Sequence, residues 1–133
     1  MFKNLTRLSF TLLIGFFITS CATYVVDEQA VVEYGCDDVV VLGRAKTLSY
    51  SVLERESDSI GLSLFKFEIT VKRVLYGSEP RRVVNASSIA HGHLRDDLDF
   101  IFVLTPSAGD YEIVSGTIWK MRPRPVLANV CSE

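Results

Sequence analysis

The chain has 133 residues, 48% of them hydrophobic, and a formal net charge of −2. This length allows one hydrophobic core and excludes two large domains. Acidic residues outnumber basic ones by 16 to 14, which argues against a nucleic-acid-binding protein, because that class normally carries a basic excess.

The N-terminus has the pattern of a secretory signal peptide, which we place at residues 1–20. Lys3 and Arg7 precede an apolar run at residues 8–18 that is too short for a comfortable transmembrane helix. The run ends in Ile-Thr-Ser-Cys, which resembles the lipobox of bacterial lipoproteins. In that family the cysteine is acylated and becomes the new N-terminus, so the resemblance implies lipidation of Cys21 and attachment to a membrane.

The residue after Cys21 refines the expected location. It is Ala22 rather than Asp, and in enteric-type bacteria Asp there is the usual signal for inner-membrane retention. The resemblance therefore points to the outer membrane of the cell envelope. The alternative is cleavage after Ala22 by ordinary signal peptidase, which would leave a soluble secreted or periplasmic protein.

The next segments predict a tether followed by two strands. Residues 21–35 are expected to be the lipid-anchored tether, with room for a short first strand, and residues 36–133 the folded domain. An apolar run at residues 39–42 continues at residues 43–47 as an alternation of small and basic residues, which predicts a half-buried strand. Polar and charged residues at 54–59 then predict a hairpin loop.

The clearest strand pattern begins at Phe65 and alternates as far as Val71. The alternation slips at Val74, which predicts a β-bulge near Lys72 and Arg73. A third strand is expected at residues 82–89, where asparagine and serine dilute the apolar pattern.

The C-terminal part predicts three more strands. A nearly continuous apolar run at residues 99–105 is typical of a central strand. A turn leads to a strand at 111–119, in which Gly116 marks a bulge or a close approach. Two prolines keep residues 121–125 extended and unpaired, and residues 126–131 are expected to return to the barrel as a last short strand.

Together these elements predict an all-β fold. Five or six strands, one of them long and coiled, favour a small closed or partly open Greek-key barrel of the OB-fold type. The alternative is an immunoglobulin-like sandwich, which needs about seven strands and a Cys–Trp–Cys order along the chain. Here Trp119 comes late and the strands are too few.

Cys36 and Cys131 remain once Cys21 is assigned to the lipid. An even pair in an oxidising compartment predicts a Cys36–Cys131 disulfide, and the alternative is two buried free thiols. Two cysteines alone are too few for a zinc site.

Two segments are similar to a known family. In residues 36–46 a cysteine precedes an Asp-hydrophobic run and an Arg-Ala-Lys strand, and residues 67–77 form a long strand that ends in Tyr-Gly. Both resemble the netrin-like OB-fold domain, best known from tissue inhibitors of metalloproteinases. The resemblance implies the barrel, and an inhibitor mechanism in which the free amine and carbonyl of an N-terminal cysteine chelate zinc. This chain departs from that mechanism, because Cys36 is internal and acylation would block the amine of Cys21.

The sequence offers little catalytic chemistry. His91 and His93 are the only histidines, and with a neighbouring carboxylate they are weak candidates for a metal site. We expect a polar surface connection there instead, with no metal and no cofactor. Neither a nucleophile elbow nor a phosphate-binding glycine loop occurs, so no enzyme is predicted.

Basic residues gather around two turns, near Arg73 and Arg82 and again near Arg122. In an envelope protein such patches can contact anionic lipid headgroups or an acidic glycan, and the alternative is a solvated surface. Trp119 precedes the second group and marks a candidate recognition stretch, because tryptophan is enriched at interfaces. Its alternative role is to cap the barrel core.

The sequence therefore predicts a non-catalytic binding or assembly module. It would contact the membrane through its lipid and an envelope protein through an exposed sheet face or edge, with Arg73, Arg82, Trp119 and Arg122 as candidate binding residues. One alternative is a peptidase inhibitor related to netrin-like domains. The other is a small metal-binding protein or hydrolase that uses His91 and His93.

Overall fold

A computed structural model describes residues 28–53 and 61–131. The expected signal peptide, Cys21 and the hairpin loop at 54–59 lie outside these residues. Among the described residues no helix is long and apolar enough to cross a membrane. Their regular structure is β, in strands β1 (Val31–Tyr34), β2 (Val39–Leu53), β3 (Leu62–Tyr76), β4 (Val83–Ala90), β5 (Phe100–Ser107), β6 (Asp110–Ile118) and β7 (Val126–Asn129).

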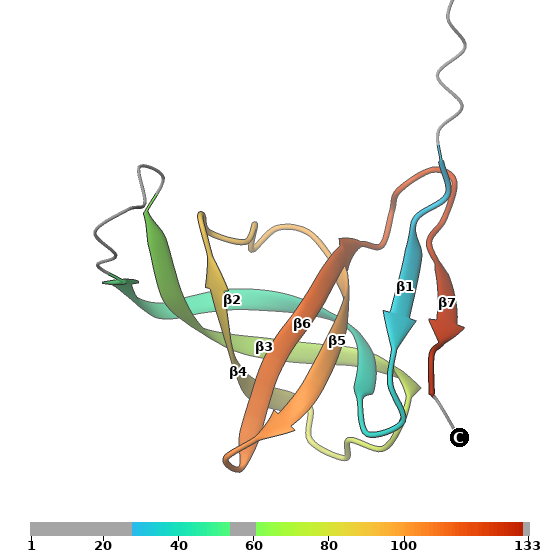
Figure 1. The fold of residues 1–133 in the computed structure, drawn as a ribbon, viewed down its shortest axis with the longest axis horizontal. Coiled ribbons are helices and arrows are strands. Elements are labelled where there is room, and N and C mark those ends of the chain that lie inside the picture. Colours follow the sequence, from blue (N-terminus) through green and yellow to red (C-terminus); the bar gives the residue numbers. More distant parts are fainter. Residues whose placement is uncertain (1–27, 54–60, 132–133) are drawn as a thin grey trace, which may run out of the picture.

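Five of the strands close into a barrel in the order β2-β3-β4-β6-β5, with β5 returning to β2 (Figure 1). All neighbours are antiparallel except β4 and β6, which pair in parallel over two residues, Ala86↔Tyr111 and Ser87↔Glu112. This connectivity is the five-stranded Greek key of an OB-fold-like barrel. The predicted all-β fold is therefore confirmed, and the chain does not form the alternative sandwich.

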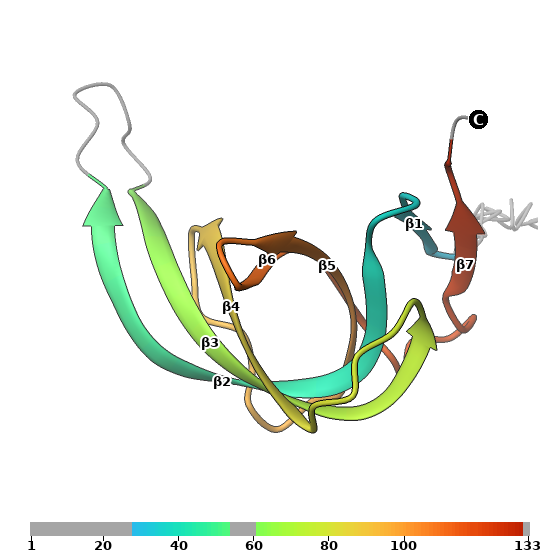
Figure 2. The same cartoon turned by 90° about the horizontal axis from the view of Figure 1, so that it is seen from below.

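The hairpin of β2 and β3 is longer than the sequence pattern predicted, at 15 residues in each strand. Figure 2 shows it curving under the barrel and continuing beyond it. The predicted bulge is confirmed, because Leu42 pairs with Arg73 and Gly43 with Val71, which leaves Lys72 unpaired. A Cβ on Gly43 would lie 2.6 Å from the backbone oxygen of Thr70, so only glycine lets the two strands approach this closely.

The described residues form two hydrophobic cores. The barrel interior is filled by large side chains such as Phe67, Ile69 and Phe102, which are almost fully buried. Val32 of β1 joins outward-facing side chains of the barrel, including Ile101 and Val103, in a second cluster. The apolar run at 99–105 is therefore continuous because alternate side chains of β5 enter different cores.

The prediction that residues 126–131 return to the barrel is wrong. β7 instead pairs in parallel with β1, in a separate two-stranded sheet beside the barrel (Figures 1 and 2). This arrangement covers the second core, which a sixth barrel strand would leave exposed. β1 is the short first strand expected within residues 21–35.

The predicted disulfide between Cys36 and Cys131 is present, with a Cα–Cα distance of 5.1 Å. Each cysteine follows its strand by two residues, because the last pair of the β1–β7 ladder is Tyr34↔Asn129. The disulfide therefore continues the ladder in register and locks the small sheet at one end.

Candidate functional site

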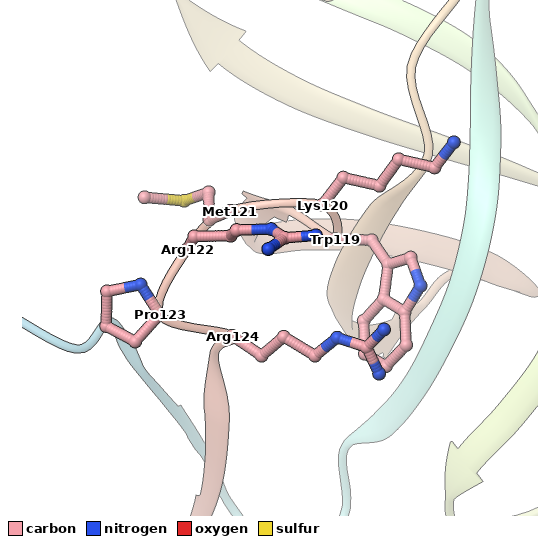
Figure 3. Close-up of a pocket in the computed structure, with 6 residues that line it drawn as sticks. All are labelled: Trp119, Lys120, Met121, Arg122, Pro123 and Arg124. Carbon is pink, nitrogen blue, oxygen red and sulfur yellow. The ribbon is translucent and has the colours of Figure 1, made fainter.

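A basic loop connects β6 to β7 and surrounds a hollow of about 710 Å³. We use this name for residues 119–124, whose side chains Figure 3 shows around the hollow. The guanidinium of Arg124 lies 5.5 Å from the ring centroid of Trp119, and that of Arg73, from β3, lies 5.8 Å from the same ring. Both contacts have the geometry of a cation–π interaction.

Trp119 does not cap the barrel interior, as one interpretation of the sequence expected, but packs on the second core. Its ring is partly buried against the second core, beside side chains such as Tyr76 and Leu75, and it also lines the hollow. The ring thus holds Arg73 and Arg124 in place while the core holds the ring.

The charges of this loop are not neutralised within the described part of the chain. Lys120, Arg122 and Arg124 make no ion pair there, whereas Arg44, Lys72, Arg81 and Arg95 each do. Moreover, residues 113–132 contain no Asp or Glu. The loop therefore presents uncompensated positive charge to solvent.

Backbone contacts fix the basic loop beside the point where the chain enters the domain. The amide of Trp119 donates to the Asp99 carbonyl at 2.9 Å, and the amide of Val126 donates to the Ala30 carbonyl at 3.0 Å. Gln29 Nε2 donates to the Arg124 carbonyl at 2.8 Å. Any tether that leads to Glu28 therefore arrives next to the basic loop.

The candidate residue Arg82 lies elsewhere. Its carbonyl accepts a hydrogen bond from the Val71 amide at 2.7 Å, which places it beside β3 at the start of β4. The structure thus brings Arg73, Trp119 and Arg122 to one region and leaves Arg82 outside the lining of the hollow.

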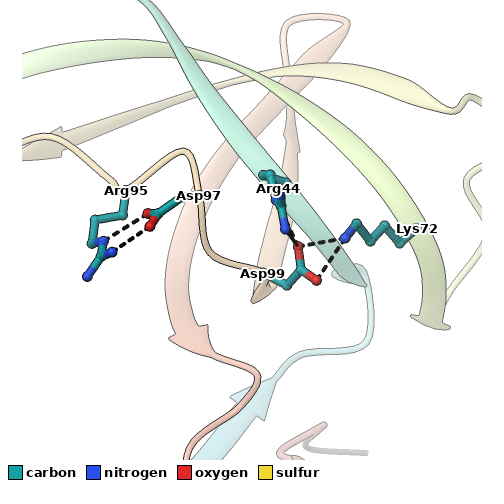
Figure 4. Close-up of polar contacts among 5 residues, drawn as sticks. All are labelled: Arg44, Lys72, Arg95, Asp97 and Asp99. Carbon is teal, nitrogen blue, oxygen red and sulfur yellow. Dashed lines mark hydrogen bonds and ion pairs between the residues drawn. The ribbon is translucent and has the colours of Figure 1, made fainter.

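A second cluster of charges, around Asp99, is structural. Its carboxylate accepts hydrogen bonds from Arg44 Nε at 3.0 Å and from Lys72 Nζ at 2.8 Å (Figure 4). The hydrogen bond from Lys72 is the main reason that the pKa of Asp99 is lowered. Since the three residues come from β2, β3 and the residue before β5, the cluster ties these strands together, and both cations are engaged by the one carboxylate. The bulge at Lys72 aims its side chain at Asp99.

Glu79 is a buried carboxylate that the sequence did not reveal. It accepts hydrogen bonds from Arg81 Nε at 2.8 Å and from the hydroxyl of Tyr111, and its side chain is 2% exposed. The bonds from Arg81 lower the pKa of Glu79 from 4.5 to about 2. The group fastens the β3–β4 turn to β6. No sequence signal exists for it, because Tyr111 lies 32 residues away.

The two histidines point to different partners. The His93 ring packs edge-on against Phe65 and Tyr50, with centroid distances of 4.9 and 5.2 Å, while His91 Nδ1 lies 3.4 Å from the Gly61 carbonyl oxygen. Within residues 28–53 and 61–131, no group of three or more His, Cys, Asp or Glu side chains is placed to hold a metal ion.

The distal half of β2 presents an open edge that sequence reasoning missed. β5 pairs with β2 only from Val39 to Gly43, and beyond Gly43 no described strand covers that edge. Residues 48–52 are all exposed, and Leu48, Tyr50 and Val52 are 53–64% exposed. From residue 47 to 53 the strand has no charged residue and no proline. The continued alternation past Thr47 was the signal available.

Comparisons with models of protein families, with curated proteins and with solved structures each found no match. The class that the fold defines is thus an OB-fold-like barrel with an appended two-stranded sheet, and its function must be argued from its own surfaces.

Proposed function

We propose that the chain is an exported lipoprotein of the bacterial envelope whose barrel is a non-catalytic binding module. In this proposal, Cys21 carries the lipid, and the free edge of β2 accepts an extended strand of a partner protein. The open edge beyond Gly43 is the observation that carries the proposal.

The chemistry of this edge supports strand addition. Natural edge strands are usually protected by charge, proline, bulges or a covering element, since bare N–H and C=O groups invite pairing with another chain. Residues 47–53 have neither charge nor proline. The pairing with β3 shifts register between Thr47 and Ser49, and it is regular from Ser49 to Leu53. An added strand would make main-chain hydrogen bonds to β2, and the exposed side chains of Leu48 and Val52 would contact alternate residues of the partner.

The positions of the cysteines weigh against the inhibitor mechanism of netrin-like domains, which needs the free amine of an N-terminal cysteine. Cys36 is internal, and in the proposed lipoprotein the amine of Cys21 is acylated. Neither cysteine then offers a free amine to the zinc of a protease, so the proposal does not extend to peptidase inhibition.

The test is site-specific photo-crosslinking of the full-length protein in cells. A photoreactive residue at Val52 should capture one partner in stoichiometric amount, and the same residue at Val114 should not. Val114 is the matched control, because it is 61% exposed against 64% for Val52 but lies on β6.

A pair of lysine substitutions then checks that the edge itself is responsible. With the photoreactive residue kept at position 52, Leu48→Lys with Ser49→Lys should abolish the cross-link while the protein still folds, since both residues are exposed on the edge strand and charges on an edge block strand addition. Val114→Lys should leave the cross-link intact. Absence of any specific cross-link at Val52 across several growth conditions would overturn the proposal.

A further inference from the structure

The basic loop lies on the surface from which the chain leaves the domain toward its N-terminus. We call this the entry surface and define it by three cations and three exposed apolar side chains: Lys120, Arg122, Arg124, Val31, Met121 and Val126. Val31 and Val126 are direct partners in the β1–β7 ladder, and the three apolar side chains are 40–56% exposed. The surface is therefore both cationic and partly apolar.

The length of chain before the described residues sets how far this surface can be from a lipid on Cys21. Seven residues lead from Cys21 to Glu28, and a fully extended chain spans at most about 3.6 Å per residue. The domain is then held within about 25 Å of the membrane. Because the side chain of Gln29 is hydrogen-bonded to the Arg124 carbonyl, the entry surface is the part of the domain that the tether brings closest to the membrane.

Charge favours the same orientation. Without the signal peptide the chain carries 12 basic and 16 acidic residues, so an anionic membrane repels the domain as a whole. The entry surface differs from this average, because its three cations face one described carboxylate in the entering segment, Glu28, and its balance is therefore positive. Screening limits attraction to about 8 Å at physiological salt, and a tether of this length allows such contact.

We propose that the entry surface lies against the anionic lipid headgroups of the membrane in which the lipid is anchored. The cations would contact headgroup phosphates, and Trp119 and Met121 would sit at the interface, where amphipathic side chains are favoured. The inference rests on the lipid anchor of the proposed function. It adds a second membrane contact and hence a fixed orientation of the barrel, with the free edge of β2 at the other end of the long axis (Figures 1 and 2).

Trp119 is the single tryptophan of the chain, so its fluorescence reports directly on this surface. The purified lipidated protein is reconstituted into vesicles of zwitterionic lipid alone, or with about a third anionic phospholipid. With anionic lipid we expect a blue shift of the emission and stronger quenching by brominated lipids. Raising the salt concentration should reverse both effects, since they depend on charge.

Charge reversal localises the effect. Lys120→Glu with Arg122→Glu should remove the difference between the two vesicle types. Lys46→Glu with Lys66→Glu is the matched control, because both lysines are exposed but lie on the β2–β3 hairpin; it should keep the difference. If the reversal variant does not fold, Lys120→Gln with Arg122→Gln should weaken the shift in the same direction.

Identical emission of the wild-type protein in both vesicle types would overturn the inference, as would a shift that the control variant loses equally. These outcomes are separable from failure of the proposed function. The mass of the mature protein shows whether Cys21 is lipidated, and the cross-link at Val52 shows whether the edge binds a protein. If Cys21 carries no lipid, the same fluorescence measurement on the soluble mature protein decides whether the entry surface binds anionic vesicles.

Discussion

The two halves of the β2–β3 hairpin share one ladder and differ in their surroundings. In the barrel half, β5 lies along the other edge of β2, and Val40 and Val41 have no exposed surface. In the distal half no strand of the described residues pairs with that edge, and Tyr50 and Val52 are more than half exposed. Alternation alone therefore does not determine burial; the element that covers the strand does.

This difference separates the residues that stabilise the fold from those available for binding. Side chains of the barrel half contribute their buried area to stability, whereas the exposed side chains of the distal half contribute little. The predictions below test that separation, beginning with the barrel interior.

The largest effect is expected from Phe67→Ala. Phe67 is 1% exposed in the barrel core, and truncation of a buried aromatic costs about 3–5 kcal/mol. The matched substitution Val52→Ala on the distal half should change stability by less than about 0.5 kcal/mol. Denaturant unfolding of both variants measures the two values, and equal losses would show that the distal half is packed after all.

Removing the disulfide should have the next largest effect. Cys36 and Cys131 are 95 residues apart, and loss of a bridge that closes so long a loop costs about 2–4 kcal/mol. Cys36→Ser with Cys131→Ser should therefore lower the unfolding midpoint, as followed by circular dichroism. Cross-linking at Val52 should persist under conditions where the variant remains folded. If the folded variant loses the cross-link, the β1–β7 sheet must influence binding at the distal hairpin.

Glu79→Gln should cost up to about 3 kcal/mol near neutral pH, since the pKa of this buried carboxyl falls from 4.5 to about 2 on folding. A lowered pKa means that the contribution is complete above about pH 4.5 and is lost as the pH falls toward 2. The stability difference between wild type and variant should therefore shrink over this window. Unfolding curves at several pH values measure it, and a constant difference would contradict the assignment.

Apart from the control Val52→Ala, the smallest effect is expected from Asp99→Asn, at the point where β2 leaves β5. Arg44 and Lys72 are 44% and 43% exposed, and exposed ion pairs contribute about 1 kcal/mol or less. High salt should reduce the difference further. Thermal unfolding at low and high salt checks both points. A loss of stability above about 2 kcal/mol would contradict the assignment of the cluster as exposed ion pairs.

The fold was largely predictable because its signals are local. Alternation gave the barrel strands, and the slip at Val74 gave the bulge at Lys72. Gly116 was expected to mark a bulge or a close approach, and the close approach is present, since a Cβ there would lie 3.3 Å from the Phe102 ring. The bulge of β6 falls at Val114 instead, where the pairing with β5 shifts register.

The features that were missed depend on contacts far apart in the sequence. Nothing local pairs β7 with β1 rather than with the barrel, or joins Glu79 to Tyr111. Likewise, the basic residues near Arg122 were evident in the sequence. Their position beside the segment that enters the domain depends on the hydrogen bond between Gln29 and the Arg124 carbonyl, 95 residues away. Spatial neighbours, rather than residue types, distinguish the candidate surfaces.

The pairing of β1 with β7 also determines when the small sheet can form as the chain is synthesised. A ribosome produces β1 first and its partner last, so β1 has no strand to join until residues 126–129 have been synthesised. A chain that stops earlier leaves β1 without its pairing strand, and with it Val32, the residue of β1 that packs with Ile101 and Val103. If β1 then detaches, part of the second core is exposed, and proteases and chaperones act on such incompletely folded chains.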